Sequence, residues 1–169
     1  TYFDGLGLSL EEPLVRTLHR NGYVGKNAPV FIQSFETSNL RELDKLTKLP
    51  LVQLLNDTGK PFDFVVANDP RTYADLASEQ GLAWIARYAD GVGPNKNLVI
   101  PRNPDGTLGF ASNLVRDAQK VGLLVHIFTI RAENPFLPTE FRNGSDPTVF
   151  GDVAGELTRF LEAGIDGFF

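Results

Sequence analysis

The sequence predicts an α/β fold in which helices cover a parallel β-sheet. Helical and strand patterns alternate along all 169 residues, which is the order typical of repeated βα units. The strand segments are mostly continuous apolar runs rather than alternating ones, as expected of strands that are buried on both faces. The composition, with 42% hydrophobic and 22% charged residues, is that of an ordinary globular domain. A chain of this length can bury one sizeable core.

Five strands are predicted, most of them from short apolar runs bounded by turn residues or glycine. They cover residues 30–35, 51–55, 90–93, 123–130 and 165–169. Helical segments alternate with them and cover residues 9–22, 37–49, 73–89, 110–122 and 153–164. Gly122 and Gly164 each stand between a helix and the next strand, where glycine is a common helix stop. The stretches 56–71 and 131–152 are predicted to be loops.

Two arrangements of a parallel sheet are compatible with this order, a doubly wound open sheet and a (β/α)₈ barrel. Five strands would complete a small open sheet, or would form the later part of a barrel of about 250 residues. The chain contains no methionine, so Thr1 is not a translation start, and the last residue falls inside a predicted strand. Both ends therefore look cut, which favours the barrel. Neither a GxGxxG nor a phosphate-loop pattern follows a strand, so the commonest ligand signature of open sheets is missing. We predict a partial TIM barrel with roughly the last five strands, residues 1–169 being the carboxyl-terminal part of a single barrel domain.

The composition also argues against several classes of function. A formal net charge of −5 is opposite to the basic surface that nucleic-acid-binding proteins present. No apolar run approaches the ~18 residues that are needed to span a bilayer. Cysteine is absent, which excludes a disulfide framework and a thiolate nucleophile. We expect no nucleic-acid partner and no membrane span.

Two histidines are the first candidates for catalysis. His126 shares one face of a predicted strand with Phe128, because side chains alternate along a strand. If Phe128 points into the mouth of a barrel, His126 lies one layer deeper, which favours a hydrogen-bonded core group over a catalytic one. His19, in 18-LHRNG-22, falls in the last turn of a helix, where the helix dipole stabilises a surface histidine without any further function.

Polar residues near strand ends are the other candidates, because the functional side chains of barrels follow the carboxyl ends of strands. Gln53 is an amide inside an apolar strand, so it either joins a buried network or faces a ligand pocket. No pair of acidic residues at i and i+2 ends a strand, and so the residues reveal no metal site. A GxSxG nucleophile pattern is also missing.

Several segments together resemble a known enzyme family. These segments are 30-VFIQSF-35, 51-LVQLL-55, 88-YADGVGPNKNLVIPR-102, 114-LVRDAQKVGLLVHIFTIR-131 and 159-RFLEAGIDGFF-169. In this order and at this spacing they resemble the later half of the glycerophosphodiester phosphodiesterases, most of all the larger periplasmic, secreted and plant-type members. The resemblance implies a TIM barrel that hydrolyses glycerophosphodiesters to glycerol 3-phosphate and an alcohol. It also implies a divalent cation, Ca²⁺ or Mg²⁺, held by carboxylates, and two histidines for acid–base chemistry.

The resemblance places the reacting groups of the family before Thr1, since its H-R-G motif, its paired Glu and Asp and a further Glu all precede the matched segment. Neither His19 nor His126 matches a catalytic histidine. We therefore expect no catalytic residue and no metal ligand in this chain, and no hydrolytic activity from it alone. The expected substrate pocket consists of Ser34, Phe35, Gln53, His126, Phe128, Thr129 and Arg131. The planar fork of Arg131 would suit a phosphate oxygen.

Partners and location also follow from the resemblance. It implies a small-molecule substrate, a periplasmic or extracellular location, and the missing amino-terminal half of the barrel as a partner. One alternative is a non-catalytic half-barrel that serves as an interaction or binding module. Another is a small open α/β binding domain, which would show a reversal in its strand order, whereas a barrel keeps sequential strands adjacent throughout.

Overall fold

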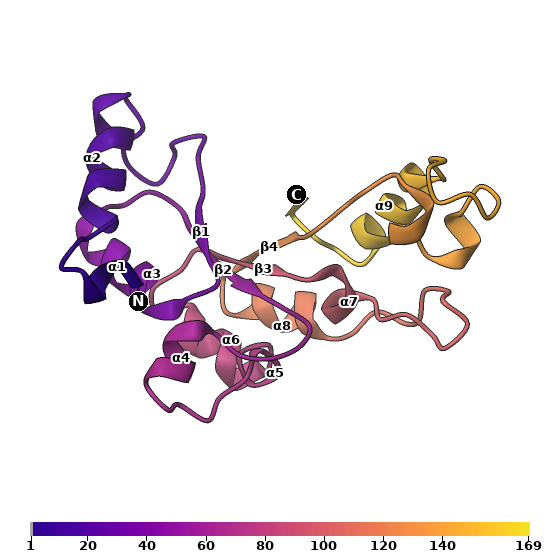
Figure 1. Ribbon diagram of the computed structural model, residues 1–169, viewed down its shortest axis with the longest axis horizontal. Helices are drawn as coiled ribbons and strands as arrows, with labels where there is room; N and C mark the ends of the chain where they lie inside the picture. Colours follow the sequence, from indigo (N-terminus) through magenta and orange to yellow (C-terminus); the bar gives the residue numbers. More distant parts are fainter. Residues whose placement is uncertain (1) are drawn as a thin grey trace.

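A computed structural model describes residues 2–169 as an α/β fold built on one parallel sheet (Figure 1). The strands are β1 (Ile32–Ser34), β2 (Leu51–Leu55), β3 (Gly91–Pro94), β4 (Leu124–Ile127) and β5 (Gly167–Phe168). Their order in the sheet is β1-β2-β3-β4-β5, and every neighbouring pair is parallel. The predicted α/β class is therefore confirmed. Among the described strands the order contains no reversal, which fits a barrel better than a doubly wound sheet.

Helices lie before β1 and between successive strands. They are α1 (Tyr2–Gly5), α2 (Glu11–Arg20), α3 (Thr37–Leu46), α4 (Phe62–Val66), α5 (Tyr73–Leu76), α6 (Glu79–Ile85), α7 (Lys96–Val99), α8 (Leu114–Lys120) and α9 (Val153–Glu162), with two short 3-10 helices, η1 (Asn134–Phe136) and η2 (Thr139–Phe141). The segments that follow β3 and β4 extend well beyond the carboxyl ends of the strands (Figure 1). None of the helices within residues 2–169 is long and apolar enough to cross a membrane.

The main hydrophobic core lies between the sheet and the helices. Alternate strand residues enter it, among them Leu51 and Val92, which are 2% and 0% exposed. Leu40 and Leu43 of α3 meet this core from the helix side. Their spacing of three residues places both on the buried face of the helix, whereas Leu46, three residues further on, is 40% exposed at the helix end.

The opposite face of the sheet carries aromatic rings that meet across β2 and β3. Phe31, beside β1, contacts the ring of His126 in β4 with 4.8 Å between the ring centroids. In a flat sheet these strands would lie about 14 Å apart, three strand spacings, so the sheet curves toward this face. Gly93 leaves room on this side for the Leu54 side chain, because a β-carbon there would lie 2.6 Å from Leu54 Cδ2. Curvature of this kind is expected of a barrel wall.

Some helices differ from the sequence prediction. The segment 73–89 is broken into α5 and α6, because the hydroxyl of Ser78 accepts the Gly81 N–H (3.1 Å) and starts a new helix. The predicted loop 56–71 contains α4. Helix 110–122 begins later than predicted, at α8.

The predicted strand boundaries and helix stops agree with the structure in part. The strand 51–55 has the predicted limits, while β1 and β4 are shorter than the apolar runs that predicted them. Gly122 and Gly164 follow α8 and α9 with positive φ angles of 82° and 92°, a conformation that glycine adopts without strain. The predicted helix stops are therefore confirmed.

Candidate anion-binding cleft

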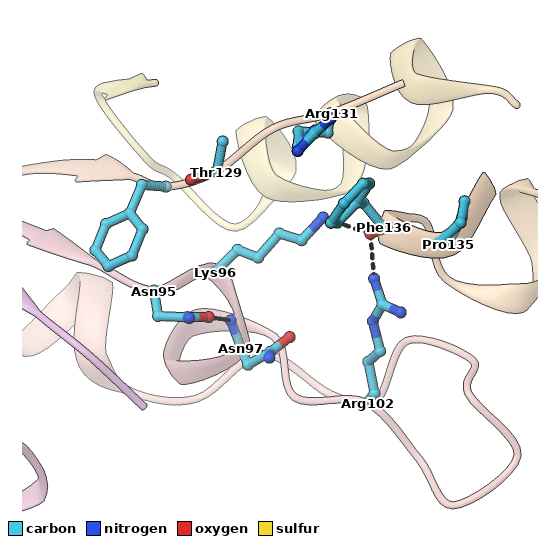
Figure 2. A pocket seen from close by; sticks show the side chains of 9 residues that line it. Asn95, Lys96, Asn97, Arg102, Thr129, Arg131, Pro135 and Phe136 are labelled. Atoms are coloured by element: carbon cyan, nitrogen blue, oxygen red, sulfur yellow. Dashed lines mark hydrogen bonds between the residues drawn. The ribbon is translucent and has the colours of Figure 1, made fainter. Parts of the chain in front are cut away.

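A cleft of about 460 Å³ opens at the carboxyl ends of β3 and β4 (Figure 2). It is lined by Asn95, Lys96, Asn97, Arg102, Phe128, Thr129, Arg131, Pro135 and Phe136. Three of these nine residues are cationic and none is acidic. The cleft therefore presents positive charge at the end of the sheet where parallel α/β proteins place their ligands.

Backbone hydrogen bonds fix the floor of the cleft. The N–H of Phe128 donates to the carbonyl of Pro94 (3.1 Å), and the N–H of Lys96 donates to the carbonyl of Phe128 (2.8 Å). The pairing of β3 with β4 thus continues beyond both strands. Asn95 then starts α7, because its side-chain oxygen accepts the N–H of Asn97 (3.0 Å). Lys96 is consequently held just beyond the carboxyl end of β3, as the first residue of α7.

Lys96 forms a buried ion pair with Glu156 of α9. Its Nζ donates to Glu156 Oε1 (2.6 Å) and to the carbonyl of Phe136 (2.9 Å). The two side chains are 10% and 0% exposed. Burial lowers the pKa of Lys96, Glu156 opposes this shift, and Arg102 adds to it. Glu156 Oε2 has no hydrogen-bond partner among the described residues, so the pair is desolvated and only partly satisfied.

Arg102 approaches the same carbonyl as Lys96. Figure 2 shows the two side chains reaching Phe136 from different directions, and Arg102 Nη2 donates to its oxygen. Arg102 Nη1 also donates to the carbonyl of Leu137 (3.2 Å). Burial lowers the pKa of Arg102, which Glu156 opposes. Lys96 is therefore buried and held by a carboxylate and a backbone oxygen, whereas Arg102 is half-buried and held by two backbone oxygens.

Arg131 is the third cation of the cleft. Its Nε and Nη2 donate to the carboxylate of Glu133 (3.2 and 2.5 Å). Its guanidinium carbon lies 4.0 Å from the centroid of the Phe136 ring, a stacked arrangement that favours a cation over an aromatic face. The side chain is 45% exposed, so Arg131 faces solvent at the rim while Lys96 and Arg102 lie deeper.

Comparison with known proteins identifies the family. Residues 10–169 match the sequence model of the glycerophosphoryl diester phosphodiesterase family. The chain belongs to this family. It is also 32% identical over 171 aligned positions to glycerophosphodiester phosphodiesterase GDPD6 of Arabidopsis thaliana. That alignment covers 96% of this chain and 42% of the plant protein, so the chain spans less than half of the curated relative that it matches. The resemblance predicted from the sequence is confirmed.

The structure of this phosphodiesterase-family chain brings together part of the predicted pocket. Phe128, Thr129 and Arg131 all line the cleft. Phe35 lies beside them, since its ring meets that of Phe128 with 5.7 Å between centroids. Ser34 does not line the cleft, and its hydroxyl instead accepts a backbone N–H at the start of α3 (3.1 Å). A role for these residues in substrate binding stays a prediction.

Gln53 is fully buried on the helix side of the sheet. Its Oε1 accepts the hydroxyl of Tyr88 (2.9 Å). Its Nε2 donates to three backbone carbonyls, those of Ser34, Phe35 and Leu54 (3.2, 3.0 and 3.1 Å). Of the two interpretations left open by the sequence, the contacts place Gln53 in a buried network, and it is not among the residues that line the cleft.

The histidines also lie outside the cleft. His126 packs between the rings of Phe31 and Phe169, whose centroids are 4.8 and 6.0 Å away, and burial lowers its pKa. It was predicted to be a hydrogen-bonded core group, yet its ring packs against these two aromatic rings and beside Gly167. His19 is exposed in the last turn of α2, as expected, with Nε2 3.2 Å from the Thr47 hydroxyl.

The side chains that the structure describes do not fit the divalent cation that the family resemblance implies. Within the described part of the chain, no three His, Asp or Glu side chains are grouped so that they could hold a metal ion. We therefore assign no metal-dependent step to these residues.

The residues that give the cleft its charge were not predicted from the sequence. Lys96 and Arg102 stand inside the segment 88–102 that carried the family resemblance, and the polar triplet 95-NKN-97 directly follows β3. Polar residues directly after a strand could therefore have been named as candidate site residues. Glu156 gave no such signal, because its partner stands 60 residues earlier in the chain.

Proposed function

We propose that the protein carrying this chain hydrolyses glycerophosphodiesters to glycerol 3-phosphate and an alcohol, and that this chain supplies the substrate-facing half of the barrel. The observation that carries the proposal is the cationic cleft at the carboxyl ends of β3 and β4 in a member of the phosphodiesterase family. Phosphodiesters are anions, and arginine and lysine are the side chains best suited to phosphate oxygens. Barrel enzymes place their active sites at this end of the strands.

The exposed inner face of the sheet supports the partial-barrel part of the proposal. Its apolar side chains Phe31, Phe35, Leu124 and Phe169 are 41%, 40%, 38% and 41% exposed. A closed barrel covers such side chains with those of the opposite strands. We propose that the amino-terminal half of the barrel is the partner that covers this face, with these five strands as the last ones of the barrel.

The residues of this chain would bind and orient the substrate rather than react with it. Arg131 is the suitable group for a phosphate oxygen at the rim, because Glu133 and the Phe136 ring hold its guanidinium plane in place. The acid–base histidines and the ligands of Ca²⁺ or Mg²⁺ would come from residues outside this chain. When bound, such a cation neutralises the charge that develops on the phosphate oxygens. A periplasmic or extracellular location is proposed from the resemblance alone.

Release of glycerol 3-phosphate from glycerophosphocholine, with Ca²⁺ or Mg²⁺ supplied, tests the proposal. A longer protein that carries the H-R-G and Glu-Asp segments should turn over, and the 169-residue chain alone should not. In the longer protein, Arg131→Met should lower kcat/KM about tenfold or more, the loss expected for a charge-assisted hydrogen bond. Arg116→Met is the matched control, since Arg116 is an exposed arginine of α8 paired with Asp117. Turnover by the chain alone, or equal values for the two variants, would contradict the proposal.

A second candidate function is a non-catalytic half-barrel that binds another chain. The exposed apolar inner face favours it, because such a surface marks an interaction site. This candidate predicts that a longer protein with an intact barrel still fails to hydrolyse any glycerophosphodiester. Both candidates assume that the chain is an open half-barrel. Light scattering of the chain alone tests this assumption, since an open half-barrel should self-associate. A monodisperse monomer would count against both candidates.

A further inference from the structure

Lys96 and Arg102 converge on one backbone oxygen in the cleft. Lys96 Nζ lies 2.9 Å from the carbonyl oxygen of Phe136, and Arg102 also donates to it. Two like charges are thus held on either side of a single neutral acceptor. In a partly desolvated cleft the repulsion between them is stronger than in water, and an anion between them would remove it.

The positive charge around this carbonyl exceeds the negative charge. Glu156 pairs with Lys96, and Glu140 also attracts Arg102 electrostatically, but no carboxylate of the described residues forms an ion pair with Arg102. Arg142 adds a further cation nearby, since its Nε donates to the carbonyl of Leu137 (3.0 Å). A cluster of cations without enough protein counter-ions is the electrostatic mark of an anion site.

Both cations retain hydrogen-bond donors for a ligand. A lysine ammonium group has three N–H donors, and Lys96 uses two of them, on Glu156 and Phe136. A guanidinium group has five, and Arg102 uses two on backbone carbonyls. Lys96 and Arg102 line the cleft, whereas Glu156 is fully buried and does not. The cations therefore stand between the ligand space and the buried carboxylate.

We propose that Lys96 and Arg102 bind a phosphate group in this cleft, and that Glu156 is the residue that positions Lys96. A guanidinium fork and an ammonium point charge are the two donors that proteins use for phosphate oxygens. The inference rests on the proposed function, and it deepens that function by naming the side chains that meet the phosphate ester. The buried carboxylate fixes the Lys96 ammonium group at the cleft without facing the ligand itself.

Titration of the 169-residue chain with a phosphate probe, followed by NMR chemical shifts, tests the proposal. The probes are inorganic phosphate, glycerol 3-phosphate and glycerophosphocholine, and the unaltered chain should bind in the millimolar range. Arg102→Met should weaken binding about tenfold or more. The variant should fold, because Lys96 still donates to the Phe136 carbonyl and Arg142 still donates to that of Leu137.

A second variant and a control keep the test decisive. Lys96→Met combined with Glu156→Leu removes both charges of the buried pair, so the fold should survive while one binding cation is lost. This double variant should also bind phosphate about tenfold more weakly. A merely structural role for Lys96 would leave its affinity unchanged. Arg116→Met makes the same change of charge on the surface of α8 and should bind like the unaltered chain.

Several results would overturn the proposal. They are equal affinity in all the variants, an equal loss in Arg116→Met, and no binding of any probe by the unaltered chain. If glycerophosphocholine binds at least as tightly as inorganic phosphate, the site serves the diester, and the reverse order assigns it to free phosphate or the monoester product. Either order supports the site. Because the titration involves no turnover, it stays informative whether or not the hydrolysis assay supports the proposed function.

Discussion

Replacing Glu156 with leucine should destabilise the chain strongly, because the Lys96 ammonium group then stays buried with only the Phe136 carbonyl as partner. Removal of one member of a buried ion pair costs about 3–5 kcal/mol. That is a large part of the about 5–15 kcal/mol that holds a typical domain together. Lys96→Met should cost a similar amount, since the carboxylate of Glu156 is 0% exposed and would lose its only donor.

The double variant Lys96→Met/Glu156→Leu distinguishes the energy of the ion pair from the effect of changing the packing of each side chain. It should be more stable than either single variant by about 2 kcal/mol or more, because no buried charge remains. The loss in Glu156→Leu should also shrink as pH rises, since an unpaired buried lysine has a lowered pKa and can shed its proton. Urea unfolding followed by circular dichroism measures all of these free energies.

An exposed pair provides the control for this cycle. Lys48 and Asp44 are 80% and 44% exposed and 4.0 Å apart, so Lys48→Met should change the free energy of unfolding by less than about 0.5 kcal/mol. If the two single variants of the buried pair prove mild, and their effects simply add in the double variant, the ion pair does not hold α9 to the cleft.

Three further predictions concern the packed interior. Tyr88→Phe should cost about 1–3 kcal/mol in urea unfolding, because Oε1 of the buried Gln53 loses its donor; an unchanged midpoint would disprove the network. Burial lowers the pKa of His126, so the unfolded state binds more protons and stability should fall as pH drops from about 7 to about 5. His126→Phe should flatten this part of the pH profile, and an equal slope in both proteins would show that other groups cause it. Gly93→Ala should cost about 1–3 kcal/mol, because the added methyl group would lie 2.6 Å from Leu54 Cδ2, and an unchanged melting temperature would refute close packing there.

The sheet could be predicted because buried parallel strands carry their signal locally. Each residue of 51-LVQLL-55 is buried, and the structure gives this strand the predicted limits. The limits of other strands depend on their neighbours and therefore could not be predicted. The apolar run 123–130 is eight residues long, yet β4 covers only Leu124–Ile127, and only two of its residues pair with β3. Strand length is thus set by the partner as well as by the sequence of the strand itself.

For the interior polar groups, the local sequence showed that partners are needed, but the partners themselves lie far away in the chain. The position of Gln53 in an apolar strand indicated that its amide needs partners, and alternation placed His126 one layer below Phe128. Local patterns could not predict which side chain points toward the helices and which toward the opposite face of the sheet. Gln53 pairs with Tyr88, 35 residues later, and His126 meets the ring of Phe31, which precedes β1.

The charge of the cleft depends on still more distant contacts. Lys96, as the first residue of a four-residue helix, has the sequence context of a solvent-exposed cation. It becomes a buried one because the chain from β4 through α9 returns over it, presenting the Phe136 carbonyl and the Glu156 carboxylate. Arg102 binds the same stretch through the carbonyls of Phe136 and Leu137. The wall of the cleft is therefore held by Lys96 and Arg102, the two cations that line it from the β3 side. Under the proposed function, an anion entering the cleft would meet donors already fixed by the fold, so the binding site and the anchoring of this segment are one structure.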